Sequence, residues 1–108
     1  MTRRPQLGVL VATGPGEGDF PSLESALLGA AQRGEEAALF LMDDGVFYAL
    51  DPRLRRFIDA GVEVSLCAMD AEARGVDCDA AAAAGVILGG QPDHARILRD
   101  CDRFLSFT

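Results

Sequence analysis

Residues 62–77, VEVSLCAMDAEARGVD, decide the fold class of this chain. Residues 62–67 alternate in character, so the two valines and Leu66 would point to one side of a strand and the residues between them to the other. An alanine-rich helical segment is expected next, around residues 70–74. The stretch therefore predicts a strand followed by a helix, with Cys67 at the junction.

The same alternation of apolar runs and helical patterns extends outward in both directions. Apolar strands separated by helical crossovers form a mainly parallel sheet covered by helices on both faces. The sequence therefore predicts one α/β domain, residues 1–108, built as a three-layer sandwich around a five-stranded, mainly parallel sheet. The other four strands are expected at 7–12, 37–42, 85–90 and 103–107.

Helix-start signals separate these strands. Ser22 is a suitable N-cap, and the pair Asp51-Pro52 suits an N-cap followed by the first helical residue. A second short helical piece is expected in the alanine run at 80–84. The last helix is expected to begin at Pro92 or Asp93, with one apolar face formed by His94, Ile97, Leu98 and Cys101.

The composition limits the environment in which the protein works. A chain of 108 residues suits one domain, and a hydrophobic content of 49% is enough for a core. No apolar run approaches the roughly 20 residues of a membrane span. The two arginines near the start precede only a short apolar run that ends in a Gly/Pro loop, which predicts a first strand and not a leader peptide. A cytoplasmic protein is expected.

Charge and cysteine content exclude several classes of function. The net charge is −7 and the chain has no lysine, so binding to nucleic acid is not expected. Three widely spaced cysteines do not form a disulfide scaffold. With no CxxC pair and a single histidine, a structural zinc site is not expected.

The predicted fold places candidate binding residues in the loops that follow the strands. In an open α/β sheet, ligands bind outside the carboxyl ends of the strands. The glycine-rich loop can be a phosphate cradle or only a flexible loop, and it has neither a Walker lysine nor GxGxxG spacing. The acidic pair after the second strand can be a metal site or a solvated turn. The residues expected to line a cleft are Thr13, Gly14, Asp43 and Asp44.

Cys67 has two interpretations that the local pattern leaves open. Cysteine is a good small core residue. It is also a nucleophile when a helix N-terminus or a cation stabilises its thiolate. Arg74 supplies a positive charge nearby in sequence, whereas Asp70 and Glu72 oppose the anion.

The remaining candidate side chains have mostly structural interpretations. Cys78 lies between two aspartates in an expected loop, where it is either a second thiol for Cys67 or an incidental surface thiol. Cys101 is expected in the core. His94 is expected to pack or to cap the last helix, with a role as a base as the alternative.

Four motifs in order resemble a known family. They are TGP at 13–15, GEEAALFLMDDGV at 34–46, CAMDAEARGV at 67–76 and CDRFLSF at 101–107. With these motifs the chain resembles, over nearly its whole length, the DsrE/DsrF-like proteins, and most closely the sulfur-relay subunits of the DsrE and TusD type. It is shorter than those subunits between the second helix and the third strand, where they carry a loop that shapes the assembly.

The resemblance implies a fold, an assembly and a chemistry. It implies an α/β sandwich assembled as a homo-oligomer, a trimer or a hexamer. It implies that Cys67 matches the cysteine that carries sulfane sulfur as a persulfide, and that the sulfur passes to a partner such as a TusA-like carrier protein. Arg74 and Gly75 follow at matching spacing, with the arginine either supporting the thiolate or anchoring the loop.

Three functions therefore remain as hypotheses. The first is a sulfur carrier in which Cys67 accepts sulfane sulfur and passes it to a partner thiol. This is a transfer step for which "enzyme" is a marginal label, and it requires no organic cofactor and no metal. The alternative is a non-catalytic oligomeric subunit for small-ligand binding or assembly. The third is a redox switch between Cys67 and Cys78, which requires their Cα atoms to approach within about 7 Å.

Overall fold

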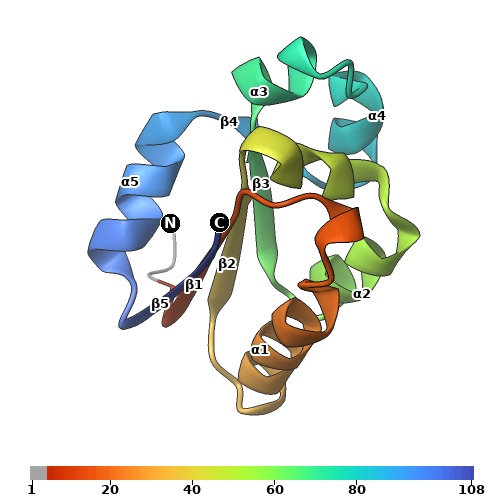
Figure 1. Ribbon diagram of the computed structural model, residues 1–108. Helices are drawn as coiled ribbons and strands as arrows, with labels where there is room; N and C mark the ends of the chain where they lie inside the picture. Colours follow the sequence, from red (N-terminus) through yellow and green to blue (C-terminus); the bar gives the residue numbers. More distant parts are fainter. Residues whose placement is uncertain (1–4) are drawn as a thin grey trace.

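The computed structural model describes residues 5–108, which form one five-stranded sheet with the strand order β4-β3-β2-β1-β5 (Figure 1). All four strand pairings are parallel, so the predicted α/β class with a mainly parallel sheet is confirmed. The strands are β1 (Leu7–Val11), β2 (Ala37–Leu41), β3 (Glu63–Cys67), β4 (Ile87–Gly89) and β5 (Arg103–Phe107).

Helices lie on both faces of this sheet. In Figure 1, α1 and α2 lie on one side, α5 lies on the other, and α3 and α4 lie beyond the carboxyl end of β3. Within residues 5–108, no helix has the length and apolar character needed to cross a membrane. The helices are α1 (Phe20–Gln32), α2 (Arg55–Asp59), α3 (Ala68–Ala73), α4 (Cys78–Ala83) and α5 (Gln91–Asp100), with 3-10 turns η1 (Pro15–Glu17), η2 (Asp43–Leu50) and η3 (Pro52–Leu54).

The larger core covers the side of the sheet on which α1 lies, called here the α1 face. It contains the alternate strand residues Val62, Val64 and Leu66, as the pattern of the third strand predicts. Aromatic side chains from three segments meet there, with the Phe20 ring 5.8 Å from that of Phe57 and 6.2 Å from that of Tyr48. Most of the apolar area that stabilises the fold is therefore buried on this face.

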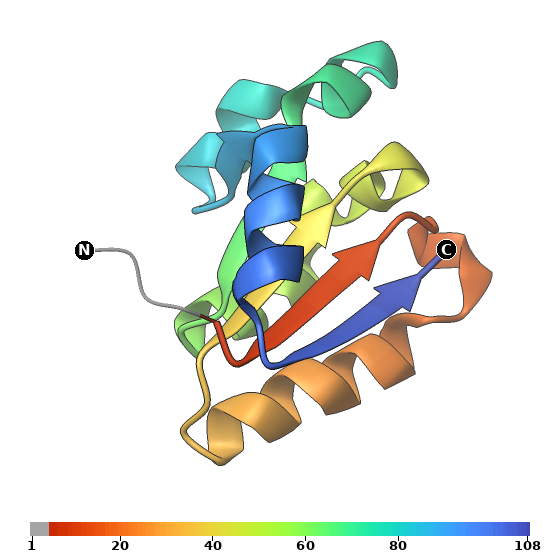
Figure 2. The same ribbon diagram turned by 90° about the vertical axis from the view of Figure 1, so that its left-hand side faces the viewer.

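The opposite side, called here the α5 face, has a much smaller core. Figure 2 shows α5 in front of the sheet, where it is the helix that covers these strands. Gly8 lets α5 approach β1, because a Cβ on Gly8 would stand 2.6 Å from Ile97 Cγ2 and 3.1 Å from Cys101 Sγ. The buried residues of this cluster are Leu10, Ala38, Phe40, Cys67 and Ile97.

Several local predictions are wrong. The first long helix begins at Phe20 with Asp19 at the N-cap position, so Ser22 lies inside it; Pro21 is accommodated because the first turn needs no N–H from it. Residues 43–50 form a 3-10 helix and not a simple turn. Leu98 was expected on the buried face of α5 but is 52% exposed, because the face that packs on the sheet follows His94, Ile97 and Cys101.

Candidate functional site

The connections that leave β3 and β4 go to opposite faces of the sheet. β3 is followed by α3 and α4, whose buried residues Ala71 and Ala81 belong to the core of the α1 face. β4 is followed by α5 on the other face. Open α/β sheets bind ligands at the carboxyl ends of two adjacent strands whose following connections lie on opposite faces of the sheet. The carboxyl ends of β3 and β4 are therefore the candidate site.

Cys67 lies at this point. It is the last residue of β3 and is paired in register with Gly89, the last residue of β4. Its backbone is extended, with φ −78° and ψ 109°, and α3 begins at the next residue. The side chain is 5% exposed and packs in the small core of the α5 face. The predicted candidate thus stands at the binding edge of the sheet, largely covered.

Arg74 holds the end of α3 against the turn that follows β2. Its Nε donates a hydrogen bond of 2.9 Å to Asp44 Oδ1, and its Nη2 lies 3.7 Å from Asp43 Oδ1. The Asp43 backbone N–H in turn donates to Asp70 Oδ2 at 2.8 Å. The hydrogen bond to Asp44 raises the pKa of Arg74. Three predicted site residues are therefore brought together in one set of contacts, called here the clasp, which joins α3 to the start of η2 at residues 43–45, called here the β2 turn.

The glycine-rich loop lies beside the same turn. Thr13 Oγ1 donates a hydrogen bond of 2.6 Å to Asp19 Oδ2, which closes the loop on itself. Gly14 lies next to the acidic turn, since a Cβ on it would stand 3.6 Å from the Asp44 carbonyl oxygen. The expected cleft residues of the first two loops therefore lie side by side.

Two glycines are required by this local geometry. A Cβ on Gly45 would overlap the Val11 carbonyl oxygen, so only glycine lets the β2 turn pass so close to the end of β1. Gly75, predicted beside Arg74, has φ +73° and donates its N–H to Glu72 O at 3.2 Å. It terminates α3, as glycine in the left-handed region commonly does.

Cys78 differs from Cys67 in its place in the fold and in the core that its side chain contacts. It is the first residue of α4 and not part of a loop, because Asp77 accepts the Ala80 N–H at 3.0 Å and caps the helix. Burial raises the pKa of the Cys78 thiol, and the charges of Glu72, Asp79 and Asp77 raise it further. Its side chain packs against the core of the α1 face.

The two thiols thus belong to cores on opposite faces of the sheet, and both are free. This placement gives no support to the redox switch.

His94 packs against aromatic rings, which is one of the roles predicted for it. Its ring lies 5.6 Å from the ring of Phe40 and 6.3 Å from that of Phe104, nearly parallel to both. Its Nδ1 lies 3.3 Å from Gln91 Oε1. Cys101 ends α5 and is half-buried against Gly8, which is less than the core position expected of it.

Sequence reasoning missed one acidic residue near Cys67. Asp93 Oδ2 accepts the Gly90 N–H at 2.9 Å and so closes the first turn of α5. A Cβ on Gly89 would overlap the Asp93 carboxylate. The paired glycines before Pro92 were the available signal, because two residues without side chains at a strand end leave room for a neighbouring group.

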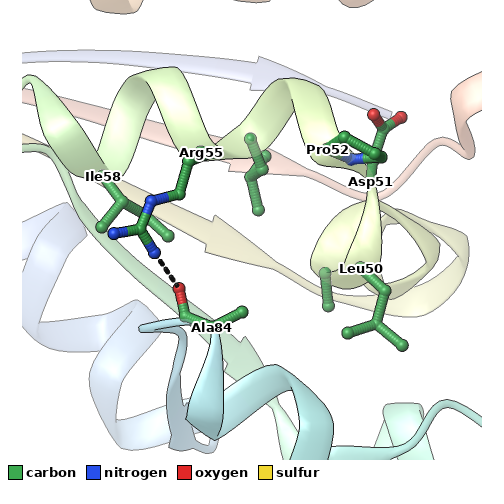
Figure 3. A pocket seen from close by; sticks show the side chains of 8 residues that line it. Leu50, Asp51, Pro52, Arg55, Ile58 and Ala84 are labelled. Atoms are coloured by element: carbon green, nitrogen blue, oxygen red, sulfur yellow. Dashed lines mark hydrogen bonds between the residues drawn. The ribbon is translucent and has the colours of Figure 1, made fainter.

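A small cavity of about 170 Å³ lies elsewhere, between the η2–α2 region and the end of α4 (Figure 3). Its wall is largely apolar, and Arg55 Nη1 donates a hydrogen bond of 3.3 Å to Ala84 O across it. None of the predicted site residues lines it. Within residues 5–108, no group of three or more His, Cys, Asp or Glu side chains is placed to hold a metal ion.

Comparison with known proteins supports the fold and the family. The model of the DsrE/DsrF-like family matches residues 7–107. The YchN protein from E. coli has a similar structure, with a TM-score of 0.75, 22% identity, and coverage of 95% of this chain and 99% of that chain. A conserved protein of unknown function from Bacteroides thetaiotaomicron, BT1422, has a TM-score of 0.73 and 17% identity over 94% of this chain and 95% of that one. No curated protein matches the sequence.

Proposed function

The chain belongs to the DsrE/DsrF-like family, and from that premise we propose that it is a sulfur carrier that holds sulfane sulfur as a persulfide on Cys67. Family membership suggests a function of the sulfur-relay type. The observation that carries the proposal is the position of Cys67 at the carboxyl ends of β3 and β4, the two adjacent strands whose following connections lie on opposite faces of the sheet.

The chemistry needs little beyond this thiol. The Cys67 thiolate attacks the sulfane sulfur of a donor, and the donor thiol leaves with the electron pair of the broken S–S bond. A partner thiolate later attacks the outer sulfur of the Cys67 persulfide in the same way. The 5% exposure of Cys67 shelters the persulfide between the two transfers, and neighbouring side chains such as Phe40 and Ile97 have to move for each transfer.

Mass spectrometry of the intact protein tests this proposal. Wild type, Cys67→Ser and Cys78→Ser are exposed briefly to polysulfide and then treated with cyanide, which removes sulfane sulfur. Wild type and Cys78→Ser are expected to gain sulfur that cyanide removes, and Cys67→Ser is expected not to. Equal sulfur gain by wild type and Cys67→Ser would contradict the proposal.

The burial of Cys67 also favours a second candidate, a non-catalytic oligomeric subunit that binds a small ligand or supports assembly. In that function the thiol is a core residue, as its apolar neighbours Phe40 and Ile97 suggest. The two candidates differ in the labelling of the native protein by a thiol reagent. A carrier is labelled at Cys67 without denaturant, whereas labelling only in denaturant supports the subunit.

The proposal extends to partners and location. We expect a homo-oligomer, a trimer or a hexamer, a TusA-like protein as a sulfur acceptor, and a cytoplasmic location. Self-association is supported by the large apolar side chains that the chain exposes. These exposed side chains are Phe47, Leu50, Met69, Ile87, Leu88, Leu98 and Leu105. Sedimentation velocity measures the oligomeric state.

A further inference from the structure

The Asp93 carboxylate occupies the space beside Cys67 on the α5 face. Residues paired in register in a parallel sheet point to the same face, and neighbouring strands lie about 4.8 Å apart. Cys67 and Gly89 are such a pair. The place where a Cβ of Gly89 would stand is filled by the Asp93 carboxylate. A negative charge therefore stands about one strand spacing, roughly 5 Å, from Cys67 on the α5 face, where the Cys67 side chain also packs.

Two contacts hold this carboxylate in place. The Gly90 N–H donates to its Oδ2 at 2.9 Å, and the Asp93 N–H donates to the Gly90 carbonyl oxygen at 3.0 Å. No arginine forms an ion pair with Asp93 among residues 5–108. The charge is thus fixed in position and is not neutralised by a salt bridge within that part of the chain.

The other charged groups around the strand end are paired or lie further along. On the α5 face, Arg96 is paired with Glu63 at 2.8 Å, at the opposite end of β3, and His94 stacks on Phe40. Beyond the strand end, Arg74 is held by the acidic β2 turn and Asp70 accepts the Asp43 N–H. Glu72 lies exposed on α3. Asp93 is therefore the ionic group that lies on the same face as the Cys67 side chain at the strand end, against the residue paired with Cys67.

We propose that Asp93 is a specificity-determining residue that disfavours anionic sulfur donors at Cys67 and selects donors that carry their sulfane sulfur on a neutral or cationic thiol. This inference rests on the proposed function. In the step concerned, Cys67–SH and R–S–SH give Cys67–S–SH and R–SH. One S–S bond forms, one breaks, the electron pair leaves with R–S⁻, and that thiolate takes up the Cys67 proton. Asp93 acts on the charge of R and takes no part in the bond changes.

The expected effect is modest and depends on salt. With its charge about 6 Å from the charge of the donor in water, Asp93 raises the transfer rate of a cationic donor about threefold and lowers that of an anionic donor about threefold. The ratio of the two rates therefore changes about tenfold. The preference is expected to shrink as ionic strength rises, because screening shortens the reach of the charge.

The test compares two small donors of similar size and opposite charge, the persulfides of cysteamine and of 3-mercaptopropionate. The measured quantity is the rate of sulfur transfer from the cysteamine persulfide divided by that from the 3-mercaptopropionate persulfide. It is followed by intact mass in the Cys78→Ser background, so that sulfur on Cys78 does not contribute, and is divided by the same ratio for free cysteine. Asp93→Asn removes the charge and keeps an oxygen that accepts the Gly90 N–H. Asp79→Asn removes an equal charge from α4, whose core contacts lie on the other face, and is the matched control.

The ratio is expected to fall three- to tenfold in Asp93→Asn and to stay unchanged in Asp79→Asn. A wild-type protein that takes sulfur but whose ratio does not change in Asp93→Asn overturns the role of Asp93 alone, whatever its salt dependence, because a chain with a net charge of −7 gives some salt dependence without Asp93. Asp93→Ser, which also removes the charge and keeps an oxygen for the Gly90 N–H, is the second variant if Asp93→Asn fails to fold. A wild-type protein that takes sulfur from neither donor overturns the proposed function and this inference with it.

Discussion

The two faces of the sheet are built very differently. The α1 face carries α1, α2 and η2 over a large aromatic and aliphatic core, whereas the α5 face carries one helix over five buried residues. Burial of apolar area is the main favourable term in folding, so the α1 face supplies most of the stability. Cys67 belongs to the sparse face. The candidate site thus lies on the face with the smaller core, where local opening is expected to cost less than on the α1 face.

The strongest test of this difference is Phe57→Ala on the α1 face. The Phe57 side chain is fully buried and stacks on Phe20, so its loss removes a large apolar area and leaves a cavity. We expect a loss of about 3–5 kcal/mol in the free energy of unfolding, measured by urea denaturation. A loss below about 1 kcal/mol would show that this core is not the main source of stability.

Ile97→Ala on the α5 face is expected to cost less but to act on the site. A loss of about 2–4 kcal/mol follows from the truncation of a buried isoleucine. Because Ile97 holds α5 over the cluster that contains Cys67, labelling of Cys67 in the native protein is expected to accelerate. Leu27→Ala on the α1 face is the matched control, since it destabilises the protein without loosening α5. Equal acceleration in both variants would mean that Cys67 is exposed only by global unfolding.

Arg74→Gln tests the clasp between α3 and the β2 turn. Its ion pairs are partly exposed, so the expected loss in the free energy of unfolding is about 1 kcal/mol or less. The variant is also expected to increase hydrogen exchange in α3 more than in α1, because α3 loses its tether. An unchanged exchange rate in α3 would show that α3 is held by its packing alone.

Asp79→Asn gives the smallest effect and concerns the thiol on the other face. Burial and three acidic residues raise the pKa of Cys78, so its thiolate forms only above the pH at which a free cysteine ionises. A raised thiol pKa means that the folded state holds the proton more tightly, so this contribution to stability is complete at neutral pH and is lost as the pH rises through the alkaline range. The variant is expected to speed alkylation of Cys78 about twofold near pH 8.5 and to leave Cys67 unchanged.

The parts of this structure that local pattern determines were predictable. The alternation in residues 62–67 predicts which of these side chains enter the large core, and Val62, Val64 and Leu66 do so. The order of strands and helices follows from the same patterns. Boundaries were less predictable, because Asp19 competes with Ser22 for the N-cap position and because a three-residue β4 leaves little periodicity to detect.

The arrangement of the site depended on contacts between distant segments. Sequence reasoning identified Cys67, Arg74, Asp43 and Asp44 as candidates, but the pairing of Arg74 with the acidic turn joins residues about thirty positions apart. Asp93 was expected only as a helix start. Its place beside Cys67 depends on the register of β3 with β4 and on the missing side chain of Gly89, and neither leaves a periodic trace in the sequence.

The strand order has a consequence for synthesis of the protein. Of the five strands of this sheet, β5 is synthesised last and pairs with β1, the first, and α5 is synthesised just before β5. While the chain is still emerging from the ribosome, β1 has an open edge and the side of the sheet that holds Cys67 has no helix over it. Open strand edges and bare apolar faces favour aggregation. A nascent chain in which residues 91–107 have not yet left the ribosome is therefore expected to require a chaperone.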